Sequence, residues 1–273
     1  MIKFNCNSCG ACCKEENVAL TVTESLKLIN KFPMVCSMKV LCLPEQAINA
    51  NANANPHLIR VESNPTYLVS FELITIPSPT GCVNLGADLM CGIYEGRPHA
   101  CAIYPVAISN KFEKIEARLI NERKNNIASN EDRPLGSEQR CEGFDDNVAK
   151  DVICENGELK DVSVIQHLEA MAKEDELSLP WVSDFLNEKL PANNALNMRE
   201  GETKSFYFPL VEFFEHVNSK LEGNPLPVED IGEIQKYINM EVLGAYELEI
   251  IPVTSSPSLR SDFINMLQIT AEY

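Results

Sequence analysis

The stretch Phe4–Cys13, FNCNSCGACC, decides the organisation of this chain, because it places four cysteines within eight residues as C-x2-C-x2-C-C. Thiolate sulfur is the soft ligand that zinc, copper(I) and iron–sulfur clusters select. Four thiolates this close together repel one another unless a cation lies between them. Gly10 can adopt the positive φ that a tight turn between cysteines needs. The pattern therefore predicts a metal centre that organises the loops around it.

A second cysteine-bearing stretch, Gly81–Pro105, reads GCVNLGADLMCGIYEGRPHACAIYP and has the spacing C-x8-C-x9-C. Its glycines and prolines indicate a rigid loop more than a helix. One further cysteine follows in the segment RCEGF. The predicted metal ligands come from both stretches and this segment: Cys6, Cys9, Cys12, Cys13, Cys82, Cys91, Cys101 and Cys141. Cys36, Cys42 and Cys154 lack ligand spacing and are predicted to be buried apolar thiols.

The identity of the metal stays open between zinc and an iron–sulfur cluster. Zinc sites usually combine two separate C-x2-C steps, whereas the overlapping run C-x2-C-x2-C resembles a ferredoxin-type loop that gives three ligands to a cubane. Eight sulfurs suit two four-ligand sites, and several partitions are compatible with the spacing. Adjacent Cys12 and Cys13 would point to opposite sides of an extended backbone, or would share one site in a tight turn.

Charge and composition narrow the classes of partner. The net charge is −17, and residues 151–273 carry 8 Lys and Arg against 23 Asp and Glu. No basic face is available for nucleic acid, an anionic membrane would repel the acidic half, and no apolar run is long enough to span a bilayer. The segment MIKFNCNSCG has no apolar core of a signal peptide. Clustered cysteines in a reducing compartment are metal ligands more often than disulfides, so we expect a cytoplasmic protein.

The hydrophobic pattern predicts an α+β protein with two domains. Residues 1–155 form a loop-rich cysteine-cluster domain with a few short strands and helices, and residues 156–273 form an acidic, mainly helical region that serves packing or a protein partner. A capping box at Thr21–Glu24 begins a helix that ends at Pro33, residues 36–65 are expected to be irregular, and alternation over residues 69–73 indicates a strand. Helices are expected from Val164, from Pro180 as a first helical residue, over residues 210–221, and over residues 228–246 and 258–268.

Together the two cysteine blocks resemble the CxxCxxCC cysteine-cluster family, also called the YkgJ family, which is described as zinc- or iron-chelating. The block CGIYEGRP after Cys82 and before Cys101 carries the resemblance, which covers about residues 4–105 and extends to RCEG at Cys141. The resemblance implies that the cysteines of both blocks are cluster positions. Arg97 in the same block is interpreted either as a cation that offsets thiolate charge or as a surface side chain before Pro98. His99, two residues before Cys101, is interpreted either as a substitute ligand or, in preference, as an exposed loop residue. His57, His167 and His216 are interpreted as structural or surface residues.

Three functions are compatible with these residues. The first is a cytoplasmic protein that binds zinc or an iron–sulfur centre through the cysteine cluster. The second is a protein lysine N-methyltransferase, because the family is related to flagellin lysine-N-methylases. Against an enzyme, the chain has no glycine-rich dinucleotide loop, no C-x3-C-x2-C spacing and no evident pair of nucleophile and base. The third is a structural zinc module within a larger assembly.

Overall fold

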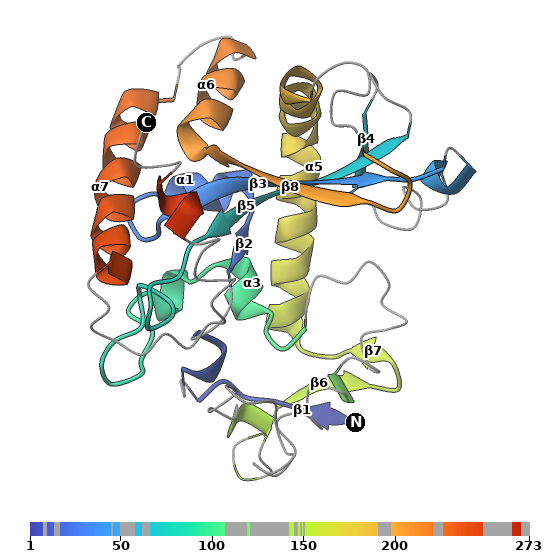
Figure 1. The fold of residues 1–273 in the computed structure, drawn as a ribbon. Helices are drawn as coiled ribbons and strands as arrows, with labels where there is room; N and C mark the ends of the chain where they lie inside the picture. The colour runs from blue at the N-terminus through green and yellow to red at the C-terminus, as the bar shows by residue number, and fades with distance from the viewer. Residues whose placement is uncertain are drawn as a thin grey trace. The chain divides into compact units, whose positions relative to one another are not determined.

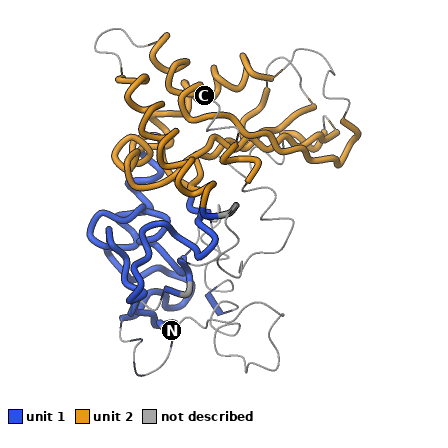
Figure 2. Tube along the Cα trace, turned by 60° about the vertical axis from the view of Figure 1, so that its left-hand side comes forward, with its two compact units in different colours: residues 1–18, 77–173, 245–263 blue, residues 19–76, 174–244, 264–273 orange. Residues whose placement is uncertain are grey.

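The computed structural model describes residues 1–7, 10–13, 17–44, 46–49, 58–61, 66–106, 119–120, 142–144, 147, 149, 151–190, 198–220, 226–247 and 264–268. These residues form a mixed α+β protein with two antiparallel sheets, as predicted (Figure 1). The chain divides into unit 1, residues 1–18, 77–173 and 245–263, and unit 2, residues 19–76, 174–244 and 264–273 (Figure 2). The predicted boundary at residue 155 separates the cysteine-rich part of the sequence from the acidic part, and it stays a prediction.

Strand β3 (Met34–Cys42) is the centre of the sheet in unit 2. It pairs antiparallel with β5 (Tyr67–Thr75) on one side and with β8 (Thr203–Pro209) on the other, so that Met38 lies opposite both Phe71 and Phe206. The short strands β2 (Ala19–Leu20) and β4 (Leu58–Arg60) pair with β5. The predicted strand over residues 69–73 is confirmed within β5.

The prediction of irregular structure is wrong for residues 36–42, which belong to β3, and for residues 58–60, which form β4. A strand with neighbours on both sides and buried side chains on both faces has no clear alternation of polar and apolar residues. The sequence of β3, MVCSMKVLC, shows little of this alternation. Helical residues 46–49 follow shortly after β3, and residues 50–57 of the predicted Ala/Asn loop lie outside the described residues.

Helix α1 (Val22–Lys27) begins with the predicted capping box. The Glu24 backbone N–H donates to the Thr21 hydroxyl over 3.1 Å, and the Thr21 backbone N–H donates to the Glu24 carboxylate over 3.0 Å. Helices α6 (Leu210–Lys220) and α7 (Val228–Glu247) confirm the helices predicted there. Residues 264–268 are also helical, and the rest of the predicted 258–268 helix lies outside the described residues.

Aromatic side chains fill the core of unit 2. The ring of Phe213 in α6 lies 5.3 Å from that of Phe185 in α5 (Val162–Lys189) and 5.1 Å from that of Phe71 in β5, measured between centroids. Phe185 and Phe213 are both fully buried. These contacts hold helices against the sheet by burial of large apolar side chains.

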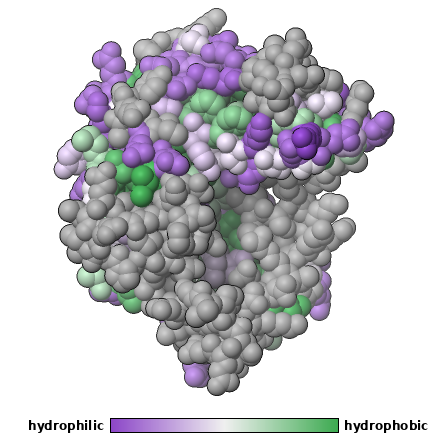
Figure 3. Space-filling model, viewed as in Figure 1, coloured by the Kyte–Doolittle hydropathy of each residue, from purple (hydrophilic) through white to green (hydrophobic). Residues whose placement is uncertain are grey.

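Helix α7 is joined to the turn before β3 by one buried amide. The Gln235 side chain accepts from the Met34 backbone N–H over 2.9 Å and donates to the Ile29 carbonyl over 2.6 Å and the Phe32 carbonyl over 2.9 Å. These bonds satisfy polar groups that would otherwise be buried unpaired. In Figure 3 the coloured part of the visible face combines hydrophilic residues with smaller hydrophobic patches.

Helix α5 (Val162–Lys189) contains Pro180 in its interior, so the prediction that this proline begins a helix is wrong. A proline inside a helix removes one backbone hydrogen bond. Buried residues on both sides of it, Met171, Val182, Phe185 and Leu186 among them, keep the helix continuous through packing. Among the described residues, no helix has an apolar stretch long enough to cross a membrane.

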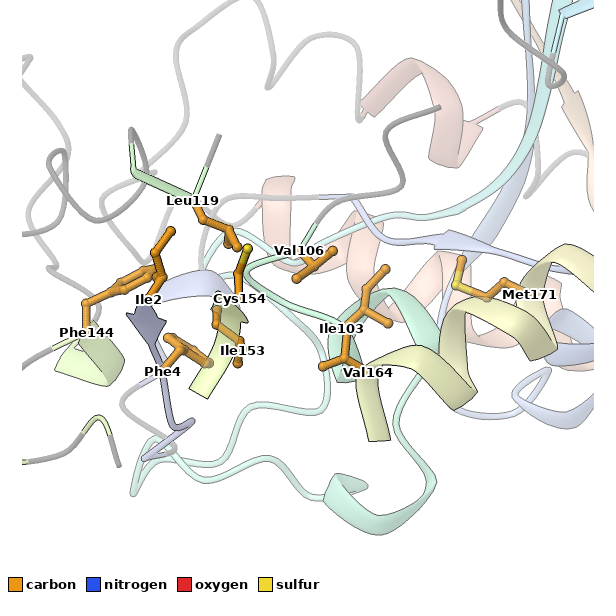
Figure 4. Packing of buried hydrophobic residues seen from close by; sticks show 10 residues of the cluster. All are labelled: Ile2, Phe4, Ile103, Val106, Leu119, Phe144, Ile153, Cys154, Val164 and Met171. Carbon is orange, nitrogen blue, oxygen red and sulfur yellow. The ribbon is translucent and has the colours of Figure 1, made fainter. Parts of the chain in front are cut away.

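Unit 1 has much less regular structure. Its sheet joins β1 (Ile2–Lys3), β6 (Val152–Glu155) and β7 (Glu158–Leu159), and its single-turn helices are η1 (Ala11–Cys13), η2 (Tyr94–Gly96), α3 (His99–Ala102) and η5 (Glu142–Phe144). A small core lies beside them, made of Ile2, Phe4, Ile103, Val106, Leu119, Phe144, Ile153, Cys154, Val164 and Met171 (Figure 4). The cysteine-bearing loops extend from this core.

Candidate metal centre

The residues before the first cysteine block are tied to the segment that follows Cys141. The Phe4 backbone N–H donates to the Asp151 carbonyl over 3.1 Å, and the Asn5 N–H donates to the Gly143 carbonyl over 3.0 Å. A Cβ at Gly143 would lie 2.4 Å from the Phe4 ring and 2.6 Å from the Asn5 carbonyl oxygen, so only glycine allows this approach. Cys141 itself lies outside the described residues. Gly143, two residues further on, contacts Asn5, the residue before Cys6.

The first cysteine block turns tightly at Gly10, as its sequence predicted. Gly10 has a φ of +73°, and the Cys13 backbone N–H donates to the Gly10 carbonyl over 3.0 Å. Cys12 and Cys13 therefore lie in the single-turn helix η1 and not in an extended segment. Of the two arrangements open for this pair, the structure has the turn.

Backbone contacts join the first cysteine block to the second. The Cys82 backbone N–H donates to the Cys13 carbonyl over 2.6 Å. A Cβ on Gly10 would lie 3.4 Å from side-chain atoms of both Leu85 and Leu89, so the turn rests against the loop 85–89. Segments separated by about seventy positions in the sequence are thus adjacent, as a metal centre shared by the two blocks would require.

The second block is folded back on itself by its own backbone. The Leu85 N–H donates to the Cys82 carbonyl over 3.0 Å, and the Gly92 N–H donates to the Asn84 carbonyl over 2.8 Å. An isolated bridge pairs Leu85 with Cys91. These bonds bring Cys82 and Cys91 close together without any helix or strand, in agreement with the predicted rigid loop.

The pKa values of two thiols in the second block respond to charge on other cysteines. Burial raises the pKa of Cys101 to about 12, with negative charge at Cys13, Cys82 and Cys91 acting in the same direction. Burial likewise raises the pKa of Cys82 to about 11, with Cys13 and Cys91 contributing. Such effects fall off with distance, and the backbone bonds described above already join the segments of Cys13, Cys82 and Cys91. Cys13, Cys82, Cys91 and Cys101 are here called the thiol cluster.

Arg97 lies beside the thiol cluster. A hydrogen bond from the Cys12 side chain lowers the pKa of Cys13 to about 7, and the Arg97 charge acts in the same direction. The same guanidinium opposes the increase in the pKa of Cys101. Its central carbon also lies 4.1 Å from the centroid of the Tyr94 ring, a cation–π contact that holds it in place. The effects of Arg97 on the pKa of Cys13 and of Cys101 favour its interpretation as a cation near thiolates.

The chemistry of these donors fits a soft cation. Burial makes a bare thiolate costly at Cys82 and at Cys101, and a zinc or iron ion compensates such charge by direct bonds to sulfur. Cys6 and Cys12 are exposed, and Cys9 lies outside the described residues. Within the part of the chain that is described, no three His, Cys, Asp or Glu side chains are already grouped as a metal site.

The three cysteines without ligand spacing are buried, as predicted. Cys36 and Cys42 lie in β3 of unit 2, and Cys154 lies in β6 within the small core of unit 1. Burial raises the pKa of the Cys36 thiol well above its usual value, which keeps it protonated and unreactive. These thiols behave as small apolar side chains.

A pair of histidines beside the thiol cluster was not predicted. His99 Nδ1 in α3 lies 2.6 Å from His167 Nδ1 in α5, and their ring centroids are 4.9 Å apart. Sequence reasoning predicts no contact between these two residues, because they are 68 positions apart and belong to regions that were interpreted as separate. The position of His99, two residues before Cys101, was the one available hint.

The first part of the chain is a cysteine-cluster metal-binding domain. Residues 5–118 match the family model CxxCxxCC, described as "Putative zinc- or iron-chelating domain". The resemblance inferred from the two cysteine blocks is thereby confirmed, and the chain carries this domain over those residues. No curated protein and no solved structure matches the chain.

Proposed function

We propose that this protein is a cytoplasmic metal-binding protein whose cysteine cluster holds zinc or an iron–sulfur centre. The observation that carries the proposal is the thiol cluster: backbone contacts join the segments of Cys13, Cys82 and Cys91, and the charges of these cysteines and of Arg97 reach Cys101. Four sulfurs are the number that one tetrahedral zinc or one cubane cluster takes from a protein.

The remaining predicted ligands have a natural place in this proposal. Cys6, Cys9 and Cys12 belong to the same block as Cys13, and Cys141 precedes Gly143, whose carbonyl accepts from the Asn5 N–H. These four cysteines would complete a second site or exchange with the first. Free thiols in this number are compatible with a reducing compartment, which is the reason for proposing the cytoplasm.

Elemental analysis of the full chain, purified without oxygen, tests the proposal. Bound zinc in a colourless protein would indicate a thiolate zinc site, whereas iron with acid-labile sulfide and a brown colour would indicate a cluster. Both results would support a cysteine-cluster centre and would decide its identity. Neither zinc nor iron in the purified protein, with no uptake on addition of either metal under reducing conditions, would overturn the proposal.

A further inference from the structure

Helix α3 carries Cys101 but has little means of holding its own position. It consists of the single turn His99–Ala102, and its N-terminal residue Pro98 offers no side-chain cap. Its two backbone bonds run from the Ala102 N–H to the Pro98 carbonyl and from the Ile103 N–H to the His99 carbonyl. One turn of helix is unstable without outside contacts, so the direction of the Cys101 thiol depends on what anchors α3.

Two kinds of contact anchor this turn to the first half of α5. Ile103 and Val106, just after α3, are buried in the same small core as Val164 and Met171 of α5 (Figure 4). Apolar contacts of this kind fix a distance but are weakly directional. The second contact is the hydrogen bond between His99 Nδ1 and His167 Nδ1, which is directional and therefore fixes a rotation.

The rotation matters because His99 and Cys101 are two positions apart. Successive residues of a helix are separated by roughly 100° around its axis, so these side chains leave α3 roughly 200° apart. When His99 is directed at α5, Cys101 is directed away from α5. The cysteines that it has to meet are Cys13, Cys82 and Cys91, whose segments are joined by the Cys82 N–H bond to the Cys13 carbonyl and by the bridge between Leu85 and Cys91.

We infer that His167 is a positioning residue for the metal centre: its hydrogen bond to His99 sets the rotation of α3 and so directs the Cys101 thiol toward the other cysteines. The inference rests on the proposed function for the thiol cluster. His167 lies outside residues 5–118, so the metal-binding domain depends on a residue beyond the family match. His167 touches no metal in this account and acts only through His99.

Zinc affinity of full-length variants, measured by competition with a chromophoric chelator, tests the inference. His167→Phe keeps the ring and its packing but removes both nitrogens, and it should weaken zinc binding roughly 10–100-fold, as loss of an outer hydrogen bond at a metal site does. His167→Asn places an amide atom where Nδ1 lies and should retain most of the affinity. His216→Phe, the same change at a buried histidine of unit 2, is the matched control and should leave zinc affinity unchanged.

A double-mutant comparison separates positioning from general damage. In a Cys101→Ser background the thiol that His167 directs is absent. Adding His167→Phe to that background should therefore weaken zinc binding by a further factor of less than about three. Cobalt-loaded His167→Phe should also lose part of the thiolate-to-cobalt absorption, while cobalt-loaded His167→Asn keeps it. An equal loss in both backgrounds would mean that His167 is merely structural and would overturn the inference.

Two further results distinguish the inference from the proposed function. Tight zinc binding by wild type with no loss in His167→Phe would overturn the inference alone, whereas a wild-type chain that took up neither zinc nor iron would overturn the proposed function. If His167→Phe does not fold, His99→Phe removes the same hydrogen bond from the other side. It should weaken zinc binding as His167→Phe would, and an unchanged affinity would reject the positioning role.

Discussion

Unit 2 and unit 1 are stabilised by different kinds of interaction. In unit 2 the nine-residue strands β3 and β5 pair along their full length, and buried phenylalanines join helices to the sheet. In unit 1 the strands have two to four residues, and the loops from Cys82 to Ile103 are held by isolated backbone bonds. A region with so little regular structure needs another source of stability, and coordination bonds to clustered thiols are one such source.

Removal of the metal should produce the largest difference between the units. Where coordination organises loops, the free energy of metal binding contributes directly to their folding. A strong chelator should therefore abolish amide protection across residues 77–106. Strands β3 and β5 should keep their protection, because their pairing and burial do not involve the thiol cluster. Hydrogen exchange with mass spectrometry of the full chain measures both.

The same experiment separates two ways of dividing the chain. If residues 1–155 behave as one domain, β3 and β5 should lose protection together with the cysteine loops. If the interleaved units are the cooperative elements, the loss should stop at about residue 77 and leave residues 19–76 unchanged. Equal loss everywhere, or none, would contradict the contrast between the two units.

Substitution of single cysteines should give the next largest effect, again confined to unit 1. Cys9→Ser and Cys91→Ser each replace a thiolate with a harder, poorly ionised oxygen, and each should lower metal content to a small fraction of the wild-type value. If the two blocks share one assembly, the double variant should be little worse than either single variant. Metal content per chain, measured after gel filtration, gives the comparison.

Cys36→Ala is the matched control, since Cys36 is a buried cysteine of unit 2. It should leave metal content unchanged. Full metal content in Cys91→Ser, or independent additive losses from the two serine substitutions, would mean that the blocks are not joined through a metal.

The contrast between the units also explains what the sequence could predict. Local signals were read correctly: the capping box at Thr21, the turn at Gly10, and the alternation within β5 each involve residues close together in the chain. The cysteine spacing predicted a cluster from short-range pattern alone, and its set of ligands stays a prediction. These features need no knowledge of the rest of the fold.

Long-range features could not be predicted in this way. Strand β3 is completed by β8, whose residues follow it by more than 160 positions, and β8 lies within a region predicted to be mainly helical. Pro180 is kept within α5 by packing that local propensity does not describe. The hydrogen bond between His99 and His167 depends on the approach of α3 to α5, for which neither residue carries a sequence signal.

Truncation of a core phenylalanine should destabilise unit 2 without changing the metal content of the protein. Phe213 is fully buried and its ring contacts those of Phe71 and Phe185. Phe213→Ala should lower the free energy of unfolding of unit 2 by about 3–5 kcal/mol, while metal content stays at the wild-type value. Denaturant unfolding followed by circular dichroism, with metal analysis of the same sample, measures both quantities.

Tyr237→Ala is the control for aromatic truncation, because Tyr237 in α7 is 72% exposed. It should change the free energy of unfolding by no more than about 0.5 kcal/mol. Loss of metal in Phe213→Ala at denaturant concentrations where the protein remains folded would show that the units are not separate in the way proposed.

The smallest expected effect is at the start of α1. The Thr21 hydroxyl accepts from the Glu24 backbone N–H and also donates to the Glu174 carboxylate, both within unit 2. Thr21→Val keeps the shape of the side chain and removes the hydroxyl, which leaves one helix N–H and one carboxylate without this partner. Loss of such a cap should lower the free energy of unfolding by about 1 kcal/mol.

Thr21→Ser keeps the hydroxyl and should recover most of that loss, so the difference between the two variants isolates the hydrogen bonds from the packing of the methyl group. Both variants should hold the wild-type amount of metal, because α1 contributes nothing to the thiol cluster. Equal destabilisation by valine and serine would assign the effect to packing. A drop in metal content in Thr21→Val alone would instead couple the cap of unit 2 to the centre in unit 1, and the division of stability between the two units would have to be abandoned.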